Sequence, residues 1–215
     1  MNAVAALIRQ GTAGIGMTLS PHALTQLAGY VELMLKWNRV YNLTAIREEQ
    51  KIVSHHILDS LAIVGHLPEG SLLDVGSGAG LPGIPVAIAQ PGRAVTLLDS
   101  NQKKGAFMRQ AVAELGLDNV KVEIARAENF HPAHSYDVVV SRAFSDLADF
   151  VNLAGHLCAP GGVMLAMKGL HPDAEIAQLP GGWRVDASPS LDIPAVDASR
   201  HLIVLRAEET ARTGH

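Results

Sequence analysis

A glycine-rich turn after a short apolar run carries the strongest chemical signal in the sequence. Residues 72–83 read LLDVGSGAGLPG, in which Asp74 precedes a G-x-G-x-G pattern and residues 78–83 fit G-x-G-x-x-G. Glycines in such a turn allow a tight reversal and let the backbone approach a ligand closely. A second carboxylate, Asp99, follows the next apolar run, where it can accept hydrogen bonds from both hydroxyls of a ribose. This combination predicts a cofactor that contains a nucleoside.

The charge of Asp74 separates two classes of cofactor. A dinucleotide places an anionic pyrophosphate against the start of the helix, and Asp74 would oppose that anion. S-adenosylmethionine places a sulfonium and an ammonium there, which Asp74 suits directly or through water. The turn therefore favours S-adenosylmethionine. The alternative without a ligand is a structural strand-to-helix turn that Asp74 caps.

Short apolar runs alternate with amphipathic segments from residue 71 onward. Strands are expected at 72–75, 95–98, 120–124, 138–140, 163–167 and 202–205, with 183–185 as a further strand. Helices are expected at about 83–90, 102–116, 146–157 and 170–179, and a turn at 159–162. This alternation predicts an α/β fold with a mostly parallel, seven-stranded sheet and helices on both faces. The last two strands would form an antiparallel hairpin at its edge.

The first third of the chain has helical periodicity instead. Ser20 and Pro21 fit the N-cap and first position of a helix, and a second helical pattern begins at about Glu48. Residues 1–19 are small and glycine-rich, which predicts a flexible N-terminus. The expected organisation is this terminus, a helical extension over 20–70 and a cofactor-binding domain over 71–215.

Composition bounds the remaining classes of function. The 215 residues are 48% hydrophobic, enough for one sizeable core. The single cysteine, Cys158, excludes an internal disulfide, and we expect a cytoplasmic protein without a membrane span or signal peptide. A net charge of −4 argues against coating nucleic acid by charge alone. His131 and His134 lack a nearby cysteine or carboxylate partner, so no metal site is expected.

Several sequence blocks, in this order, resemble one known family. They are WNRVYNLT (37–44), HILDS (56–60), residues 74–85, LLDS (97–100), RAE (126–128) and SRAF (141–144). Together they are similar to the RsmG (GidB) family, which methylates guanine N7 in small-subunit 16S ribosomal RNA. The resemblance covers about residues 37–169, with a weaker match at 199–202. It implies a class I methyltransferase fold, a Rossmann-like α/β architecture that binds S-adenosyl-L-methionine.

The resemblance also implies the residues of the cofactor site. They are Gly76, Gly78, Leu81, Asp99, Ala127, Glu128 and Arg142. The first three would line the methionine and sulfonium end, and Asp99 would hold the ribose. Residues 127 and 128 would flank the adenine, and Arg142 would face the methionine end or the substrate.

The acceptor chemistry predicts no catalytic base. Guanine N7 is a neutral nitrogen with an exposed lone pair, so the enzyme has to align it with the methyl group and exclude water. Candidate substrate contacts are His56, Asp59, Arg142, Lys168 and Arg200. His56 and Asp59, three residues apart, either face the pocket or satisfy each other.

Aromatic and basic side chains provide further candidates for RNA contacts. Trp37, Tyr41 and Phe144 could stack on a base, although core packing is the favoured use of Trp37. For Lys103, Lys104 and Arg109, a solvated helix face is favoured over phosphate contacts.

Other readings stay open at this point. They are a nicotinamide-dependent oxidoreductase, a non-catalytic module that binds ribosomal RNA, and a methyltransferase with another acceptor, since a fold does not fix the acceptor. The resemblance implies 16S ribosomal RNA or the small subunit as the partner, and a near-neutral chain favours the assembled subunit over naked RNA. A monomer is the expected oligomeric state.

Overall fold

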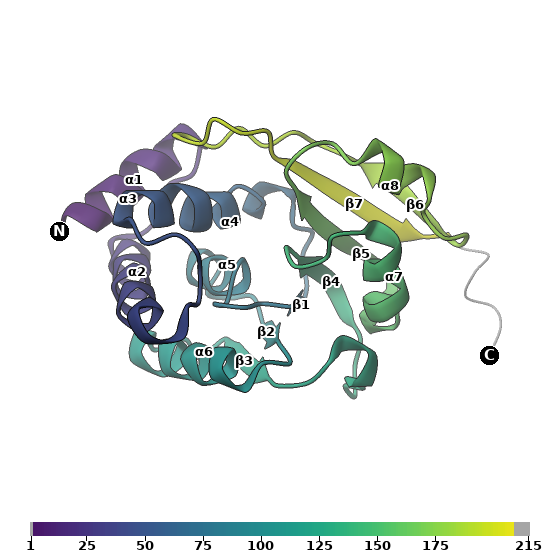
Figure 1. Cartoon of the computed structure of the whole chain (residues 1–215), viewed down its shortest axis with the longest axis horizontal. Coiled ribbons are helices and arrows are strands. Elements are labelled where there is room, and N and C mark those ends of the chain that lie inside the picture. Colours follow the sequence, from purple (N-terminus) through teal and green to yellow (C-terminus); the bar gives the residue numbers. More distant parts are fainter. Residues whose placement is uncertain (1, 209–215) are drawn as a thin grey trace.

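The computed structural model describes residues 2–208 and contains one seven-stranded sheet in the order β3-β2-β1-β4-β5-β7-β6 (Figure 1). The strands are β1 (Leu72–Val75), β2 (Val95–Leu98), β3 (Val120–Glu123), β4 (Tyr136–Ser141), β5 (Cys158–Lys168), β6 (Trp183–Ala187) and β7 (His201–Ala207). Strands β1 to β5 are parallel, whereas β7 runs antiparallel to both β5 and β6. The predicted mostly parallel sheet with a late antiparallel hairpin is confirmed.

The expected turn at 159–162 is wrong, because these residues belong to β5. Cys158 pairs with Tyr136, and the register then shifts before Val163 pairs with Val138. Gly161 has a φ of +78° within this irregular stretch. A bulge therefore accommodates the Pro-Gly-Gly sequence while the strand continues.

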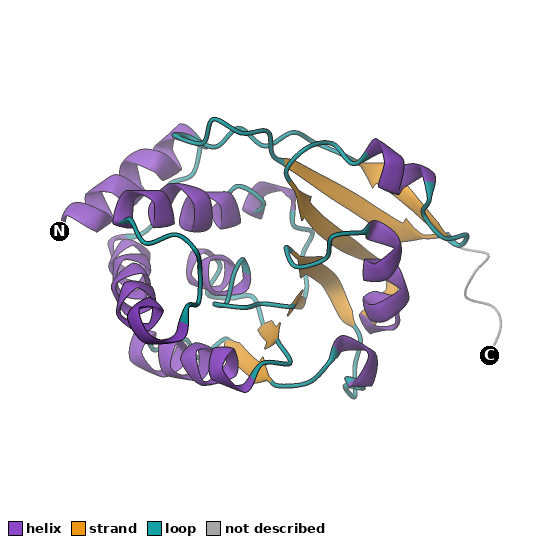
Figure 2. Cartoon of the chain, viewed as in Figure 1, coloured by secondary structure: helices purple, strands orange, loops and turns teal. Residues whose placement is uncertain are grey.

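Helices cover both faces of the sheet, as Figure 2 shows. They include α5 (Gly83–Ala89), α6 (Gln102–Leu115), α7 (Leu147–Ala154) and α8 (Asp173–Ala177). Helices α5 and α6 bury their apolar sides in one core cluster, and α7 buries its side in a second cluster. Leu72 belongs to the first cluster and Leu73 to the second, since successive side chains of a strand point to opposite faces.

The prediction of a flexible N-terminus is wrong for residues 3–14, which form helix α1 (Ala3–Gly14). The side chain of Asn2 caps it by accepting a hydrogen bond from the Ala5 N–H at 2.9 Å. Ile8 is fully buried in the core. A β-carbon on Gly11 would overlap the Leu58 side chain, so this glycine permits close helix packing rather than chain freedom.

The remaining N-terminal helices include α2 and α4, which pack against the helices α5 and α6. Helix α2 (Pro21–Tyr41) begins at Ser20, whose hydroxyl accepts from the Ala23 N–H, and ends at Asn42 with φ +48°. The second predicted helix is divided into α3 (Glu49–Ile52), the π-helical η1 (Val53–Leu58), α4 (Asp59–Leu61) and η2 (Val64–His66). The buried residues of these segments join the cluster that includes strands β1 and β4, so the extension and the sheet share one core.

The strand order brings the carboxyl ends of β2, β1 and β4 to one edge. Order reverses between β1 and β4, and ligands of open α/β sheets bind beyond such a point. Across residues 2–208, no helix is both long enough and apolar enough to cross a membrane.

Candidate active site

The glycine turn lies at the carboxyl end of β1. Its backbone is left-handed at Gly76 (φ +71°) and at Gly78 (φ +61°). A β-carbon on Gly76 would lie 2.6 Å from the β-carbon of Ala143, so the approach of these two segments requires glycine. A β-carbon on Gly78 would meet nothing nearer than 3.9 Å. The turn therefore presents its backbone to open space on one side while it packs tightly on the other.

Asp74 lies fully buried beneath this turn. Its Oδ2 accepts a hydrogen bond from the Gly83 N–H at 2.9 Å, whereas its Oδ1 has no hydrogen-bond partner among residues 2–208. Burial raises the pKa of Asp74 to about 7, although the Gly83 N–H and the charge of Arg142 partly oppose that rise. An unpaired buried carboxylate oxygen is costly, and a cationic donor would satisfy it.

Asp99 joins the glycine turn to the end of β2. Its Oδ2 accepts from the Gly78 N–H at 2.8 Å, and its Oδ1 accepts from the Asn101 N–H at 2.8 Å. Each carboxylate oxygen keeps further acceptor capacity after one such bond. The carboxylate is therefore fixed in orientation and can still accept hydrogen bonds from a pair of hydroxyls.

A cavity of about 320 Å³ opens beside these groups. Four of the expected cofactor residues line it: Gly76, Asp99, Ala127 and Glu128. Nine other residues complete the lining and were not assigned to the cofactor from the sequence: Val75, Leu98, Ser100, Lys104, Ala125, Arg126, Ala143, Phe144 and Leu153. Most of them adjoin the ends of β1 to β4, which is the positional signal that would have found them.

Three expected cofactor residues do not line this cavity. Gly78 is connected to it through its hydrogen bond with Asp99. Leu81 is 5% exposed and packs in the core beneath the turn. Arg142 lies along a second, smaller cavity.

This second cavity, about 120 Å³, brings four of the five candidate substrate residues together. Asp59, Arg142, Lys168 and Arg200 line it with Met167, Gly169, Leu191 and His201. Asp59 is buried, and its two oxygens accept from Arg142 Nη1 at 2.9 Å and from Arg200 Nε at 3.0 Å. One carboxylate thus holds two guanidinium groups, whose side chains are each 24% exposed. We refer to Asp59, Arg142 and Arg200 as the two-arginine cluster.

His56 lies beside this cluster without pairing with Asp59. Its Nε2 is 2.7 Å from the Thr44 hydroxyl, and its Nδ1 is 3.0 Å from the His55 carbonyl and 3.4 Å from Arg142 Nη2. The alternative in which His56 and Asp59 satisfy each other is therefore wrong. Burial, and then the charge of Arg142, lowers the pKa of His56 to about 4, so the ring is neutral near pH 7.

Lys168 is held within the chain. Its ammonium donates to the Phe144 carbonyl at 3.2 Å, the Ser145 carbonyl at 2.9 Å and Glu175 Oε2 at 2.7 Å. An ammonium has three hydrogens, and three acceptors use them all. Lys168 therefore anchors the segment that follows β4, which carries part of the lining of both cavities.

Replacing Lys168 by methionine is expected to lower the free energy of unfolding by about 2 kcal/mol, because Glu175 and two carbonyls lose their shared donor. The slope of log affinity for RNA against log salt concentration should stay that of the wild type. A slope reduced by about one would contradict this reading and would indicate a phosphate contact by Lys168.

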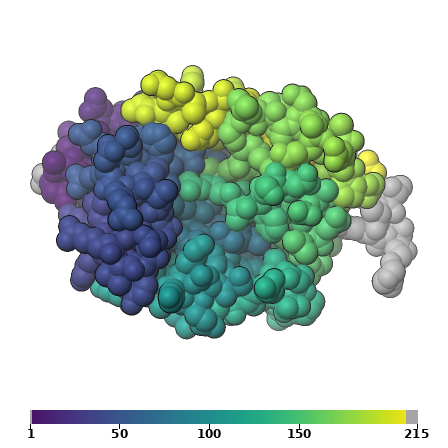
Figure 3. Space-filling view, in the orientation of Figure 1, coloured from purple at the N-terminus to yellow at the C-terminus, as the bar shows by residue number. Residues whose placement is uncertain are grey.

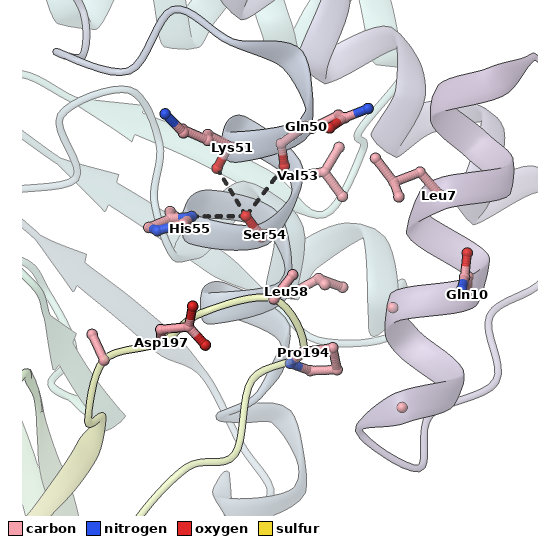
Figure 4. A pocket seen from close by; sticks show the side chains of 14 residues that line it. Leu7, Gln10, Gln50, Lys51, Val53, Ser54, His55, Leu58, Pro194 and Asp197 are labelled. Carbon is pink, nitrogen blue, oxygen red and sulfur yellow. Dashed lines mark hydrogen bonds between the residues drawn. The ribbon is translucent and has the colours of Figure 1, made fainter.

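A larger cavity of about 820 Å³ lies elsewhere, between α1, η1 and the loop 194–198 (Figure 4). Leu58 and Pro194 border it, and a hydrogen bond of 2.7 Å joins Ser54 to His55 at its edge. The sequence signals did not point to this region. Among residues 2–208, no cluster of three or more histidine, cysteine or acidic side chains is arranged to hold a metal ion.

Solved structures of low sequence identity share the fold. TrmN from Thermus thermophilus superposes with a TM-score of 0.56 at 21% identity, covering 73% of this chain and 53% of that one. A SAM-dependent methyltransferase from Geobacter sulfurreducens, solved in complex with S-adenosyl-L-homocysteine, gives a TM-score of 0.51 at 15% identity, with coverage of 71% and 90%. The predicted class I methyltransferase fold is confirmed.

Relatives of known name are similar along almost the whole chain. Ribosomal RNA small subunit methyltransferase G of Laribacter hongkongensis (strain HLHK9) is 52% identical over 198 residues, which cover 92% of this chain and 96% of that protein. The protein of the same name from Aromatoleum aromaticum (strain DSM 19018 / LMG 30748 / EbN1) is 52% identical over 207 residues, with coverage of 94% and 98%. The family pattern named GidB, rRNA small subunit methyltransferase G, matches residues 23–203. The chain belongs to the GidB family of rRNA small subunit methyltransferases.

Proposed function

We propose that this protein transfers a methyl group from S-adenosylmethionine to N7 of a guanine in 16S ribosomal RNA. Family membership supports the reaction and the class of acceptor. The observation that carries the cofactor assignment is Asp74 Oδ1, which is buried without a partner in residues 2–208 at the foot of a glycine turn. A pyrophosphate would be repelled at this place, so the nicotinamide alternative loses support.

The residues present fit this cofactor. Asp74 would accept a hydrogen bond from the ammonium directly or through water, Asp99 would bind the ribose, and the segment Ala127–Glu128 would flank the adenine. Gly76 and Gly78 leave room for the methionine end, and Leu81 supports their turn from the core. When bound, S-adenosylmethionine supplies an electrophilic methyl group on a sulfonium.

The chain then has to position the acceptor and keep water out. N7 of guanine needs no deprotonation, and the pKa of about 4 makes His56 a weak base beside the site. Arg142 and Arg200, oriented by Asp59, would bind phosphates of the RNA, because a planar guanidinium matches phosphate oxygens. His56 would hold the edge of this cluster next to Arg142.

The proposal also covers the compartment, the oligomeric state and the form of the substrate. We expect a cytoplasmic monomer that methylates assembled small subunits faster than naked RNA, because an overall charge of −4 favours a preorganised acceptor. Equal rates on both substrates would contradict that expectation.

The decisive experiment uses S-adenosylmethionine with a labelled methyl group and small subunits that lack native methylation. Cleavage at N7-methylguanine then maps the label. Label at one guanine N7 would support the cofactor, the reaction and the acceptor together. Cofactor binding without transfer would remove the assigned acceptor, and no cofactor binding would remove the assigned cofactor.

Affinity for S-adenosylmethionine is expected to rise about tenfold between pH 6 and pH 7.5, because the ammonium requires ionised Asp74. Isothermal titration calorimetry measures this profile. Asp74→Asn should bind more weakly with a flat profile. 5′-Methylthioadenosine, which lacks the ammonium, should show no difference between the two proteins. A wild-type profile in Asp74→Asn would contradict the assignment.

The Asp74 carboxyl also makes the stability of the cofactor-free protein depend on pH. Its pKa is raised from 3.8 to about 7 in the folded state. The folded state therefore binds the proton more tightly, and this contribution to stability is full below about pH 4 and is lost as pH rises through 7. Asp74→Asn should gain stability relative to the wild type over that interval, as chemical denaturation would show.

A further inference from the structure

A ladder of aromatic rings runs from the core to the surface between α2 and α6. Tyr30 and Phe107 have ring centroids 6.2 Å apart, Phe107 and Trp37 5.5 Å, and Trp37 and Tyr41 4.9 Å. Tyr30 and Phe107 are fully buried, whereas Tyr41 is 45% exposed. The ladder therefore ends in a ring with one face packed on Trp37 and surface left open to solvent.

The position of Tyr41 is fixed by its neighbours. Its ring is inclined by 35° to that of Trp37, which is itself packed on Phe107 of the other helix. Among residues 2–208, Tyr41 is the one aromatic residue with a large exposed surface. An exposed ring that is already held by packing loses little conformational freedom when a flat partner stacks on it.

Two positive charges without an ion pair lie on the segments that flank the end of α2. Arg47 reaches back to the end of α2, where its Nη2 donates to Asn42 Oδ1 at 3.0 Å. Lys103 lies in the first turn of α6. Helix α6 is antiparallel to α2, since Gln26 near the start of α2 donates to the Leu115 carbonyl at the end of α6, while Trp37 near the end of α2 packs on Phe107 in the first half of α6. Within the described part of the chain, neither Arg47 nor Lys103 forms an ion pair.

Residues of the same segments line the cofactor cavity or contact residues beside the second cavity. Lys104, next to Lys103, lines the cofactor cavity. Thr44, three residues after Tyr41, contacts His56, and His56 contacts Arg142 of the two-arginine cluster. Figure 3 shows the end of α2 and the following loop (dark blue) on the left of the face, with α6 (teal) below them.

We propose that Tyr41 is a stacking platform for a base of single-stranded RNA near the target guanosine, with Arg47 and Lys103 binding the adjacent phosphates. An aromatic face flanked by cations is the surface that unpaired RNA requires, because every base has a π-face and every linkage carries a negative charge. This inference rests on the proposed function and names the part of the chain that holds RNA outside the reacting nucleotide.

The test compares Tyr41→Ala, Tyr41→Leu and Tyr41→Phe in the full-length protein. Loss of stacking costs about 1–3 kcal/mol per base, so Tyr41→Ala should raise KM for unmethylated small subunits by about 5- to 150-fold. Tyr41→Leu keeps apolar area without the ring and should resemble the alanine variant, whereas Tyr41→Phe should resemble the wild type. KM for S-adenosylmethionine should not change in any variant, and Tyr41→Phe should unfold at the wild-type temperature because it keeps the ring packed on Trp37.

The salt dependence of RNA binding distinguishes the contribution of charge from that of stacking. Arg47→Gln should lower the salt slope of RNA binding by about one, whereas Tyr41→Ala should weaken binding without changing that slope. An unchanged KM in Tyr41→Ala, or a Tyr41→Leu variant that resembles Tyr41→Phe, would overturn the platform.

Failure of the proposed function gives a different pattern. Fluorescence anisotropy with a dye-labelled single-stranded RNA measures binding without turnover. A wild type that transfers no methyl group, but whose RNA affinity falls in Tyr41→Ala and stays in Tyr41→Phe, would remove the function and keep the platform. If the wild type methylates subunits but all variants bind the RNA with equal affinity, the proposed function is kept and the stacking role of Tyr41 is removed.

Discussion

Replacing Gly76 by alanine is expected to reduce affinity for S-adenosylmethionine by about 100-fold. The left-handed backbone at φ +71° costs a residue with a β-carbon about 1–2 kcal/mol, and the overlap with the β-carbon of Ala143 adds about 1–3 kcal/mol. The turn can relieve both only by moving, which carries the backbone away from the cofactor. A total of about 3 kcal/mol corresponds to two orders of magnitude in the dissociation constant.

Gly116 provides a matched control for this change. It ends α6 with a φ of +62°, and a β-carbon there would meet no atom within 4 Å. Gly116→Ala should therefore show the backbone cost in thermal unfolding and leave cofactor affinity unchanged. If calorimetry finds equal affinities in Gly76→Ala and the wild type, the turn does not contact the cofactor.

Replacing Asp59 by asparagine is expected to have the second large effect. Arg142 and Arg200 would lose the carboxylate that orients them, and one would face the amide NH₂ instead. Leaving two partly buried guanidinium groups uncompensated should cost about 3 kcal/mol of folding stability, the lower end of the range for broken buried pairs. Loss of two charge-assisted contacts should raise KM for small subunits by about 100-fold while KM for the cofactor changes little.

Asp186 is the matched control for Asp59. It too bridges two arginines, at 2.8 Å to Arg184 Nη1 and 2.9 Å to Arg206 Nε, but on the exposed edge of the sheet. Asp186→Asn should leave unfolding and kinetics unchanged, because exposed ion pairs contribute little. Equal kinetics of Asp59→Asn and Asp186→Asn would show that the two-arginine cluster does not position substrate.

Much of the fold could be predicted from the sequence because the patterns that indicate it are local. Strand alternation, helical periodicity and turn residues each concern neighbours within a few positions, and they predicted all seven strands. The flexible N-terminus was the main error. The glycines at positions 11 and 14 favoured a flexible backbone when only the sequence was considered. In the structure, Gly11 packs against Leu58 from a helix more than forty residues away.

The surroundings of Asp59 depend on contacts between distant segments. Basic residues near strand ends were recognised as candidates, and Lys168 was among them. Whether an ammonium faces RNA or three internal acceptors depends on Glu175 and the carbonyls after β4, which no local pattern brings together.

Local sequence patterns were enough to predict the fold class, the glycine turn and the two aspartates that select a cofactor, because strand, turn and helix follow one another directly in residues 72–99. Which charged side chains meet depends instead on the tertiary structure. Asp59 pairs with residues 83 and 141 positions away. Trp37, which supports the Tyr41 ring, packs in turn on Phe107 of α6, a helix that follows the first two strands. Such contacts depend on how the sheet orders its strands and on which helices cover each face, and a pattern of neighbouring residues does not encode those distances.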